Sequence, residues 1–165
     1  MFPCNHTPIP ELYVSADSAR KLKHEAAALP SWDLTARQVC DLELLMNGGF
    51  HPLKGFLGQA DYDSVVQTMR TADGALWPMP ITLDVTETFA DGIEPGQDIA
   101  LRDPEGVILA ILSVTDKWVP DKAREAEMVF GANDLAHPAV NYVHNVAGKV
   151  YLGGPVTGIQ PPVHY

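Results

Sequence analysis

The segment DIALRDPEGVILAILSV, residues 98–114, decides the fold class of this chain. Its middle part, residues 103–106 (DPEG), has the composition of a β-turn, so the residues on either side are expected to form a hairpin. The returning arm, residues 107–114, is an almost continuous apolar run, which is typical of a strand that is buried on both faces. We therefore expect this arm to be a central strand of its sheet.

Short extended segments are expected on both sides of this hairpin. Apolar and polar residues alternate over residues 81–86, which predicts one short strand. Nearer the C-terminal end, residues 149–152 and 156–159 flank Gly153-Gly154 and are expected to form two further strands. The second half of the chain is therefore expected to be rich in strands.

Helices are expected mainly within the first 70 residues. Apolar residues recur there at three- and four-residue spacing over residues 15–29, 35–46 and 61–70. Thr35 and Gln38 have the spacing of a capping box at the start of the second of these helices. Two shorter helices are expected later, one over residues 122–130 and one that starts at His137-Pro138. This order of elements is that of an α+β domain.

Acidic residues outnumber basic residues in this chain. Its 165 residues include 21 Asp and Glu but only 11 Lys and Arg, which gives a formal net charge of -10 at pH 7. Lys21 and Lys23 come closest to a basic patch, and Glu25 follows them on the same predicted helix. Because such a chain repels phosphate backbones, we expect no nucleic acid among its partners.

The remaining composition favours a protein that is neither embedded in a membrane nor exported. No apolar run approaches the ~20 residues that a membrane-spanning helix needs, so we expect no membrane partner. The N-terminal residues have neither the basic flank nor the apolar stretch of a secretory signal, which favours a cytoplasmic location. Cys4 and Cys40 are expected to be reduced thiols, with Cys40 on an apolar helix face, and they are too few for a zinc site built mainly from thiolates.

The histidines and serines form no recognisable catalytic or metal-binding motif. His137 and His144 are seven residues apart in the sequence, which is too far on one helix for a single metal ion. His51 precedes Pro52 and has no matched nucleophile or carboxylate motif beside it. No serine lies in a G-x-S-x-G segment, and no glycine-rich segment matches G-x-x-x-x-G-K-S/T. We therefore predict no catalytic, cofactor-binding or metal-binding residue in this segment.

Acidic pairs and tryptophans are expected to have surface or packing roles. Asp61 and Asp63 lie two residues apart, as do Glu125 and Glu127, and this spacing on a helix points side chains to different sides. We therefore expect these carboxylates to be surface charges rather than a pair that shares a proton. No Lys or Arg is interleaved with the tryptophans as a base-stacking platform requires, so packing is favoured for Trp32, Trp77 and Trp118.

One stretch of the sequence carries a specific motif. Residues 41–56 read DLELLMNGGFHPLKGF, which resembles the opening block of ATP sulfurylases, where a helix runs into N-G-G-F-x-P-L-x-G-F. Further segments resemble the same family in the same order, at residues 76–81, 99–106, 129–140 and 151–154. The matched residues of the first block are Asn47, Gly48, Gly49, Phe50, Pro52, Leu53, Gly55 and Phe56.

The resemblance implies a PUA-like fold, a compact mixed β-barrel with N-terminal helices. The matched residues would then be structural: Gly48 and Gly49 would let a helix end with positive φ, and Gly55 would relieve crowding in a loop. The resemblance also implies that residues 1–160 are the N-terminal domain of an ATP sulfurylase. Residues 161–165 would begin the linker to a catalytic domain.

In this family a following domain transfers the adenylyl group of Mg-ATP to sulfate, with Q-x-R-N, H-x-x-H and G-R-D segments. None of these segments occurs in this chain. Arg102-Asp103 resembles part of the last segment, but Leu101 replaces its glycine, so a role in the turn is expected. The resemblance therefore implies a domain of sulfate adenylyltransferase that is inactive by itself, whose partner is the catalytic domain of the same chain and whose parent is a homo-oligomer.

Two other functions remain open from the sequence. One is a free-standing PUA-like RNA-binding module, for which the acidic net charge is unfavourable. The other is a small hydrolase that uses His51 or His137, although neither has a second matched group. For the favoured domain, the apolar residues of segment 151–165 predict a face that docks against the catalytic domain.

Overall fold

The computed structural model describes residues 8–164, which divide into two units. Residues 8–54, 99–111 and 156–164 belong to the first unit, and residues 55–98 and 112–155 to the second. Two strands, β5 (Ile108–Ser113) and β7 (Val150–Gly158), contribute residues to both units. Helices and strands are both well represented, so the predicted α+β class is confirmed. Within residues 8–164, no helix has both the length and the apolar character that crossing a bilayer requires.

The first unit contains two of the predicted N-terminal helices. α1 (Ala16–Ala26) starts after Ser15, whose hydroxyl accepts a hydrogen bond from the Ser18 N–H at 3.3 Å. It ends at Ala26, short of the predicted end at residue 29. α2 (Ala36–Met46) starts with the predicted capping box, because the Thr35 hydroxyl accepts from the Gln38 N–H and the Gln38 side chain accepts from the Thr35 N–H. The predicted start of α2 is therefore confirmed.

A small apolar cluster forms part of the core of the first unit. Its buried members are Ala26, Ala100, Ile111 and Ile159, and the partly buried side chains packed against them are Ala19, Leu22, Leu29 and Ile108. The α1 residues in this cluster recur every three or four positions, so the predicted apolar face of α1 is the face that packs. β1 (Ser31–Asp33) pairs in parallel with β4 (Asp98–Arg102), and Trp32 lies opposite Leu101.

The predicted hairpin of β4 and β5 forms at the predicted turn. The Asp103 N–H donates to the Val107 carbonyl at 3.0 Å, and the Asp103 carboxylate accepts from the N–H groups of Glu105 and Val107 at 3.0 and 2.8 Å. β5 is buried from Leu109 to Leu112, as its apolar run predicts. The expected turn role is therefore confirmed for Asp103, whereas Arg102 is the last residue of β4.

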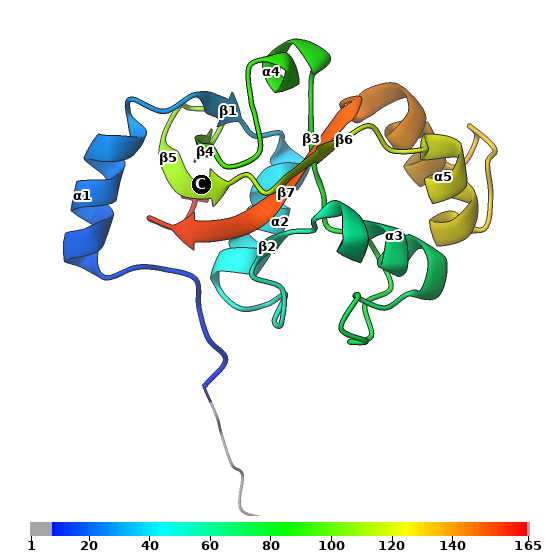
Figure 1. Cartoon of the computed structure of the whole chain (residues 1–165), viewed down its shortest axis with the longest axis horizontal. Helices are drawn as coiled ribbons and strands as arrows, with labels where there is room; N and C mark the ends of the chain where they lie inside the picture. The colour runs from blue at the N-terminus through cyan, green and yellow to red at the C-terminus, as the bar shows by residue number, and fades with distance from the viewer. Residues whose placement is uncertain (1–7, 165) are drawn as a thin grey trace, which may run out of the picture. The chain divides into compact units, whose positions relative to one another are not determined.

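In the second unit, β7 runs between two other strands (Figure 1). β3 (Leu83–Val85) and β6 (Asp116–Trp118) pair antiparallel with β7 and place Leu83 and Lys117 opposite Leu152. β2 (Gly55–Phe56) pairs with a later part of β7, where Phe56 lies opposite Gly154. The prediction of two separate strands, residues 149–152 and 156–159, is wrong because β7 continues through both glycines between them.

Close backbone approach explains why Gly153 and Gly154 continue this strand instead of ending it. A Cβ atom on Gly153 would lie 2.3 Å from the Leu57 carbonyl oxygen, and one on Gly154 would lie 2.0 Å from the Ser113 carbonyl oxygen. Gly154 also has a φ of 152°, which residues with a side chain rarely adopt. The two glycines therefore mark the place where other backbone segments contact β7.

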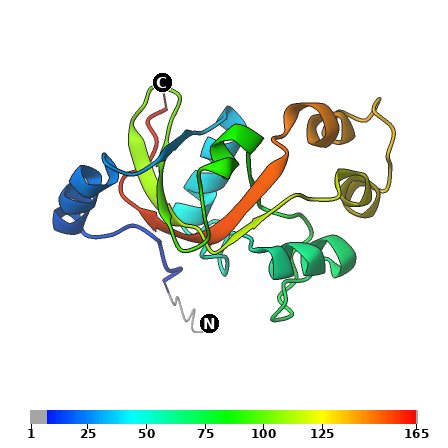
Figure 2. The same cartoon turned by 45° about the horizontal axis from the view of Figure 1, so that its top comes forward.

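Helical segments of the second unit contact one another (Figure 2). α5 (Lys122–Phe130) contacts α3 (Gln59–Thr68), α6 (Pro138–Asn141) and the π-helical turn η1 (Tyr142–Val146). The Asp121 carboxylate caps α5 by accepting a hydrogen bond from the Arg124 N–H at 3.0 Å. α3 covers residues 59–68 rather than the predicted 61–70. Met69, predicted on the apolar face of this helix, is instead its exposed C-cap with a φ of 55°.

Several local features differ from the sequence-based expectations. β1, β2, β6 and α4 (Glu87–Asp91) are too short to show a periodic pattern and are not predicted. Thr82 and Asp84 are buried, although their alternation with apolar residues is typical of a strand with one exposed face. Cys40 is exposed, so its predicted place on an apolar helix face is wrong, and Cys4 lies outside the described residues.

The segment 151–165 does not form the predicted docking face. Tyr151, Leu152, Val156 and Ile159 expose 2%, 0%, 6% and 7% of their surface, so these side chains belong to the protein interior. Val163 is exposed, and Tyr165 lies outside the described residues. The predicted docking face is therefore wrong, because most of its apolar residues pack inside this chain.

Candidate functional site

The matched motif, residues 47–56, begins at the end of α2. Asn47 is the C-cap of this helix, and its side-chain oxygen accepts a hydrogen bond from the Gly49 N–H at 2.9 Å. Gly48 has a φ of 81°, and a Cβ atom there would lie 2.7 Å from Ile9 Cγ2. Glycine therefore suits the left-handed exit of the chain from α2 at this position.

Two other motif glycines differ in detail from the sequence-based expectations. Gly49 does not have a positive φ, so the left-handed exit from α2 depends on Gly48 alone. Gly55 lies in β2 rather than in a loop, and a Cβ atom on it would lie 2.1 Å from the Gly154 carbonyl oxygen. Gly55 therefore permits the close pairing of β2 with β7.

The remaining motif residues shape the chain that follows α2. The Leu53 N–H donates to the Phe50 carbonyl at 2.8 Å, and Pro52 follows a cis peptide bond. Phe56 is an apolar anchor that exposes only 2% of its surface. None of the eight matched residues is ionisable, so the motif supplies no acid, base or anion clamp of its own.

The histidines considered in the sequence analysis are His51, His137 and His144. His51 is exposed, and the exposed His137 stacks against Phe130 with ring centroids 5.8 Å apart. His144 Nε2 lies 2.8 Å from the Asn133 side-chain oxygen. Among residues 8–164, no group of three or more His, Cys, Asp and Glu side chains could hold a metal ion.

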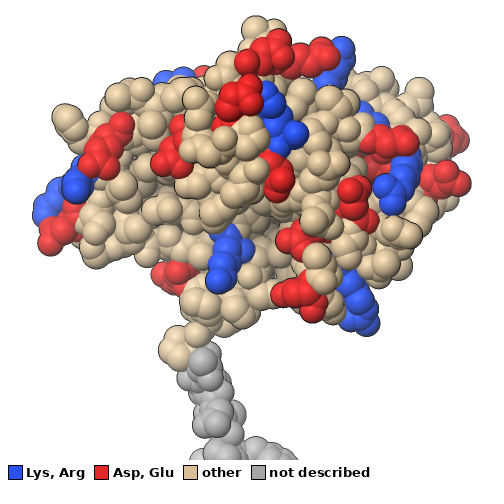
Figure 3. Space-filling view, in the orientation of Figure 1, with Lys and Arg blue, Asp and Glu red and all other residues tan. Residues whose placement is uncertain are grey.

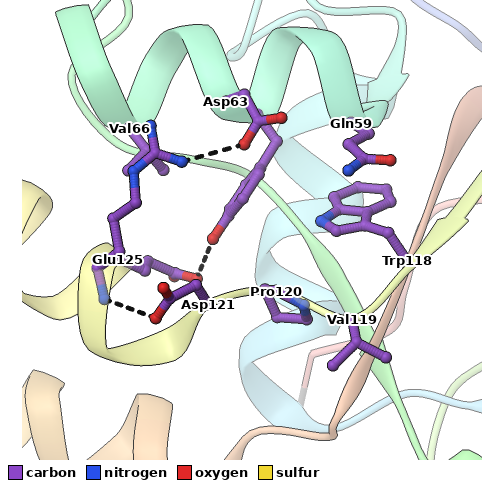
Figure 4. Close-up of a pocket in the computed structure, with 10 residues that line it drawn as sticks. Gln59, Asp63, Val66, Trp118, Val119, Pro120, Asp121 and Glu125 are labelled. Atoms are coloured by element: carbon purple, nitrogen blue, oxygen red, sulfur yellow. Dashed lines mark hydrogen bonds and ion pairs between the residues drawn. The ribbon is translucent and has the colours of Figure 1, made fainter.

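A small cavity in the second unit is lined by polar and aromatic side chains (Figure 4). One face of α3 contributes residues at three- and four-residue spacing, Gln59, Tyr62, Asp63 and Val66. Trp118 of β6, the linking residues 119–121, and Arg124 and Glu125 of α5 complete the lining. The volume of this cavity is about 140 Å³, well below the ~300–1,000 Å³ of usual small-molecule sites.

A buried carboxylate lies beside this cavity. Glu125 exposes only 5% of its surface, so its predicted role as a surface charge is wrong. Its Oε2 accepts hydrogen bonds from the Tyr62 hydroxyl at 2.8 Å and from the Tyr151 hydroxyl at 3.0 Å. Because burial of a carboxylate is unfavourable without donors, these two hydroxyls compensate for the water that Glu125 has lost.

Three aromatic rings form a cluster around these hydrogen bonds. The ring centroids of Tyr62 and Trp118 are 5.5 Å apart, those of Tyr62 and Tyr151 are 5.7 Å apart, and those of Trp118 and Tyr151 are 5.9 Å apart. Both contacts of Tyr151 are close to perpendicular, at 88° and 80°, which is a favoured geometry for aromatic pairs. Trp118 is buried with its Nε1 lacking a hydrogen-bond acceptor, so its predicted packing role is confirmed.

The tyrosine beside the cavity is a hydrogen-bond donor rather than an acid or base. Burial raises the pKa of Tyr62 far above its usual value, and the charge and hydrogen bond of Glu125 raise it further. A general acid or base works best when its pKa lies near the operating pH. The Tyr62 hydroxyl therefore stays protonated at neutral pH and stabilises the Glu125 carboxylate.

The cationic side chains of Arg124 and Lys122, near the cavity, interact with other groups of the second unit. Arg124 pairs with Asp63 at 3.5 Å, and Lys122 Nζ donates to the Ala147 carbonyl at 2.7 Å. Burial lowers the pKa of Lys122, although the negative charge of Asp84 opposes this effect. On the face drawn in Figure 3, Lys and Arg are scattered among Asp and Glu instead of forming one patch. The cavity therefore lies where α3, β6 and α5 pack together, and its described lining residues do not include the free cations expected of a site for a negatively charged substrate.

A family model described as a PUA-like domain matches residues 3–161. The chain belongs to the PUA-like domain family, as the motif at residues 47–56 predicts. Within that family it corresponds to the N-terminal region of sulfate adenylyltransferases, so the resemblance to ATP sulfurylases is confirmed.

The similar proteins are much longer than this chain. Sulfate adenylyltransferase of Eremothecium gossypii is 51% identical over 150 residues, which are 91% of this chain and 30% of the relative. That of Schizosaccharomyces pombe is 50% identical over 147 residues, 88% of this chain and 30% of the relative. That of Saccharomyces cerevisiae is 47% identical over 167 residues, 99% of this chain and 32% of the relative. The chain thus spans less than a third of the length of these curated relatives.

A solved structure supports the same fold. The structure described as a hexameric APS kinase from Thiobacillus denitrificans is 33% identical to this chain, with a TM-score of 0.73. The match covers 94% of this chain and 26% of that one. Nearly all of the present fold therefore recurs as one quarter of a larger protein.

The cluster around Glu125 could not be found by motif matching, because its members are distant in the sequence. Tyr62, Trp118 and Tyr151 come from α3, β6 and β7, which pack together only in the folded chain. One signal was available: Glu125 precedes Val129 by four residues and so shares a face of α5 with an apolar side chain. A carboxylate on such a face indicates a buried charge with donors elsewhere in the chain.

Proposed function

We propose that this chain is the N-terminal domain of a sulfate adenylyltransferase and that it catalyses no reaction by itself. The observation that carries the proposal is the coverage of the relatives. Their similarity extends over 88–99% of this chain, but the chain spans only 30–32% of each relative. A segment with this coverage is a module of the longer enzyme rather than a small version of it.

In the proposed parent, other segments transfer the adenylyl group of Mg-ATP to sulfate, which gives adenosine 5′-phosphosulfate and pyrophosphate. Such a transfer needs cationic groups held around the triphosphate. In this chain Arg124 is paired with Asp63, and Lys122 is bonded to a backbone carbonyl. These contacts support the assignment of ATP and magnesium to the other segments, with no cofactor held here.

The proposed partner of this domain is the remainder of the same polypeptide, to which residues 161–165 would lead as a linker. We further propose a cytoplasmic homo-oligomer that serves sulfate assimilation. Support for an oligomer comes from the similar solved structure, which is described as hexameric. The formal net charge of -10 and the scattered cations of Figure 3 disfavour nucleic acid as a partner.

Sulfate-dependent exchange of labelled pyrophosphate into ATP tests this proposal. The 165-residue chain with Mg-ATP and sulfate is expected to give no exchange above a protein-free control. A chimera in which this chain replaces the matching N-terminal region of the Saccharomyces cerevisiae enzyme is expected to be active. Exchange by the isolated chain, or a folded chimera without exchange, would contradict the proposal.

Binding to a mixed RNA pool tests the alternative module. Titration of the isolated chain at physiological salt is expected to give no saturable binding in the sub-micromolar range, because the formal net charge is -10 and the cations on the face drawn in Figure 3 are dispersed. Binding in that range that weakens steeply as salt is raised would favour the RNA-binding function instead.

A further inference from the structure

A hairpin that follows α3 exposes apolar side chains. This apolar hairpin, residues 69–79, includes Met69, Leu76 and Met79, which expose 56%, 68% and 52% of their surface. Exposed leucine and methionine side chains are ordinary when they occur singly, but three of them in one short segment are a local concentration of exposed apolar side chains. The hairpin lies wholly within the second unit.

Backbone hydrogen bonds hold the apolar hairpin in one conformation. Arg70 and Leu76 form an antiparallel bridge, and the Trp77 N–H donates to the Met69 carbonyl at 2.8 Å. Closer to the tip, the Thr71 N–H donates to the Ala75 carbonyl at 2.9 Å. The exposed side chains are therefore presented from an ordered backbone, which lowers the entropy lost when a partner binds.

A contact with α3 fixes the position of the hairpin as well as its shape. The Asp61 carboxylate accepts a hydrogen bond from the Ala72 N–H at 2.8 Å. Asp73 accepts from the Thr71 hydroxyl at 2.5 Å and from the Ala75 N–H at 3.3 Å, and these hydrogen bonds lower the pKa of Asp73. The tip therefore carries a stable negative charge beside its apolar side chains.

We propose that the apolar hairpin is the docking surface of this domain for the remainder of a sulfate adenylyltransferase polypeptide. The inference rests on the proposed function. It is motivated by chain length, because about two thirds of each relative lie outside the region that this chain matches, as the 30–32% coverage shows. A partner in the same polypeptide is present at high effective concentration, so it can keep an apolar surface covered permanently.

Most apolar residues of segment 151–165, which the sequence predicts as the docking face, are buried, and this also favours the apolar hairpin as the docking surface. The residues Tyr151, Leu152, Val156 and Ile159 are already packed inside this chain and cannot contact a partner without unfolding it. Leu76 is fixed in a bridge yet 68% exposed, so a partner can bury it without rearranging the hairpin. The partner surface is expected to be apolar at its centre, with a cation facing Asp73.

Hydrogen exchange in the isolated chain and in the chimera with the Saccharomyces cerevisiae enzyme tests this inference. Amides of residues 69–79 are expected to exchange about tenfold more slowly in the chimera than in the isolated chain, because the partner covers them. Leu76→Asp is expected to restore fast exchange in the chimera and to lower its Tm by several degrees. In the isolated chain the same substitution is expected to leave the Tm within about 1–2 °C of the unsubstituted chain.

Val163→Asp is the matched control, because Val163 is 69% exposed and lies outside the hairpin. It is expected to leave both hairpin exchange and the Tm of the chimera unchanged. Equal exchange of residues 69–79 in the chimera and the isolated chain would overturn the docking surface, and so would equal effects of Leu76→Asp and Val163→Asp. Slow exchange that appears in the isolated chain only at high concentration would also overturn it, since the occupant would then be a second copy.

The pyrophosphate exchange assay separates this inference from the function on which it rests. If the chimera is active but residues 69–79 exchange as fast as in the isolated chain, the docking surface is contradicted and the proposed function is not. A folded chimera with a covered hairpin and no exchange activity supports the docking surface and contradicts the proposed function. A folded chimera with neither property contradicts both.

Discussion

Two regions of the second unit depart in opposite ways from the usual distribution of polar and apolar side chains. Around Glu125, a carboxylate is 5% exposed and receives hydrogen bonds from two tyrosines. In the apolar hairpin, Leu76 is 68% exposed on an ordered backbone. The buried carboxylate finds its donors within this chain, whereas the proposed partner of the exposed leucine belongs to another part of a longer polypeptide.

The contrast between the two regions shows how their roles can be distinguished. A buried polar group with satisfied hydrogen bonds holds elements together, so substitutions there should weaken the isolated chain. An exposed apolar group on a rigid loop contributes little to the isolated chain, so substitutions there should matter only when the partner is present. Substitutions in each of the two regions can therefore test this distinction.

The largest effect is expected from Glu125→Ala. This substitution leaves the Tyr62 and Tyr151 hydroxyls without their shared acceptor and opens a cavity, so the free energy of unfolding should fall by about 3–5 kcal/mol. Urea denaturation of the isolated chain measures the change. Glu127→Ala is the control on the same helix, because Glu127 is exposed and its loss should change stability by less than about 0.5 kcal/mol. Similar effects of the two substitutions would show that the hydrogen bonds of Glu125 do not hold α5 to α3 and β7.

A smaller loss is expected when either tyrosine is changed to phenylalanine. Tyr62→Phe and Tyr151→Phe each remove one hydrogen bond to a charged acceptor, which is typically worth about 1.5–3 kcal/mol. Both hydroxyls donate to Glu125 Oε2, so the double variant leaves that oxygen without both of these donors. A double-mutant cycle by urea denaturation should therefore give a non-zero coupling energy, and strict additivity would contradict the shared acceptor.

Alkaline pH should weaken the same cluster. The pKa of Tyr62 is raised in the folded chain, first by burial and then by Glu125, above the usual value of 10.0. A raised folded pKa means that the stabilisation is complete below pH 10 and decreases as the pH rises further, because the unfolded chain then loses this proton more readily. One proton limits the slope to about 1.4 kcal/mol per pH unit, and solvent screening reduces the pKa shift and so the total loss of stability. Unfolding measured between pH 8 and 11 should be less pH-dependent in Tyr62→Phe than in the unsubstituted chain.

Local patterns in the sequence predict the parts of the fold that depend on nearby residues. The capping box of Thr35 and Gln38 and the turn at Asp103 form as predicted, because each satisfies its hydrogen bonds within a few positions. The path of β7 does not follow from its neighbours. Gly153-Gly154 has the composition of a break, and only the close approach of other backbone segments makes it the interior of a strand.

The candidate site is less predictable from the sequence than the fold. Two-residue spacing correctly separates Glu125 from Glu127, but it cannot say which of the two faces the interior. The four-residue spacing of Glu125 and Val129 favours Glu125, but its hydrogen-bond donors, Tyr62 and Tyr151, lie 63 and 26 residues away in the sequence. The exposure of Leu76 has the same origin, since an apolar residue in a predicted loop can be covered or exposed depending on distant segments.

The smallest effect is expected at the tip of the apolar hairpin, from Gly74→Ala. Gly74 has a φ of 94°, and a Cβ atom added there would have no other atom within 4 Å, so alanine would meet backbone strain of about 1 kcal/mol but no clash. Gly92→Ala is the matched control, because Gly92 has a φ of -88° and a Cβ atom there would make an ordinary contact with the Phe89 carbonyl oxygen at 3.7 Å. Thermal unfolding should therefore detect a small loss for Gly74→Ala and none for Gly92→Ala. If both substitutions were neutral, the hairpin would not be held in this conformation in the isolated chain, and Leu76 would lose the preorganised backbone on which its proposed docking role depends.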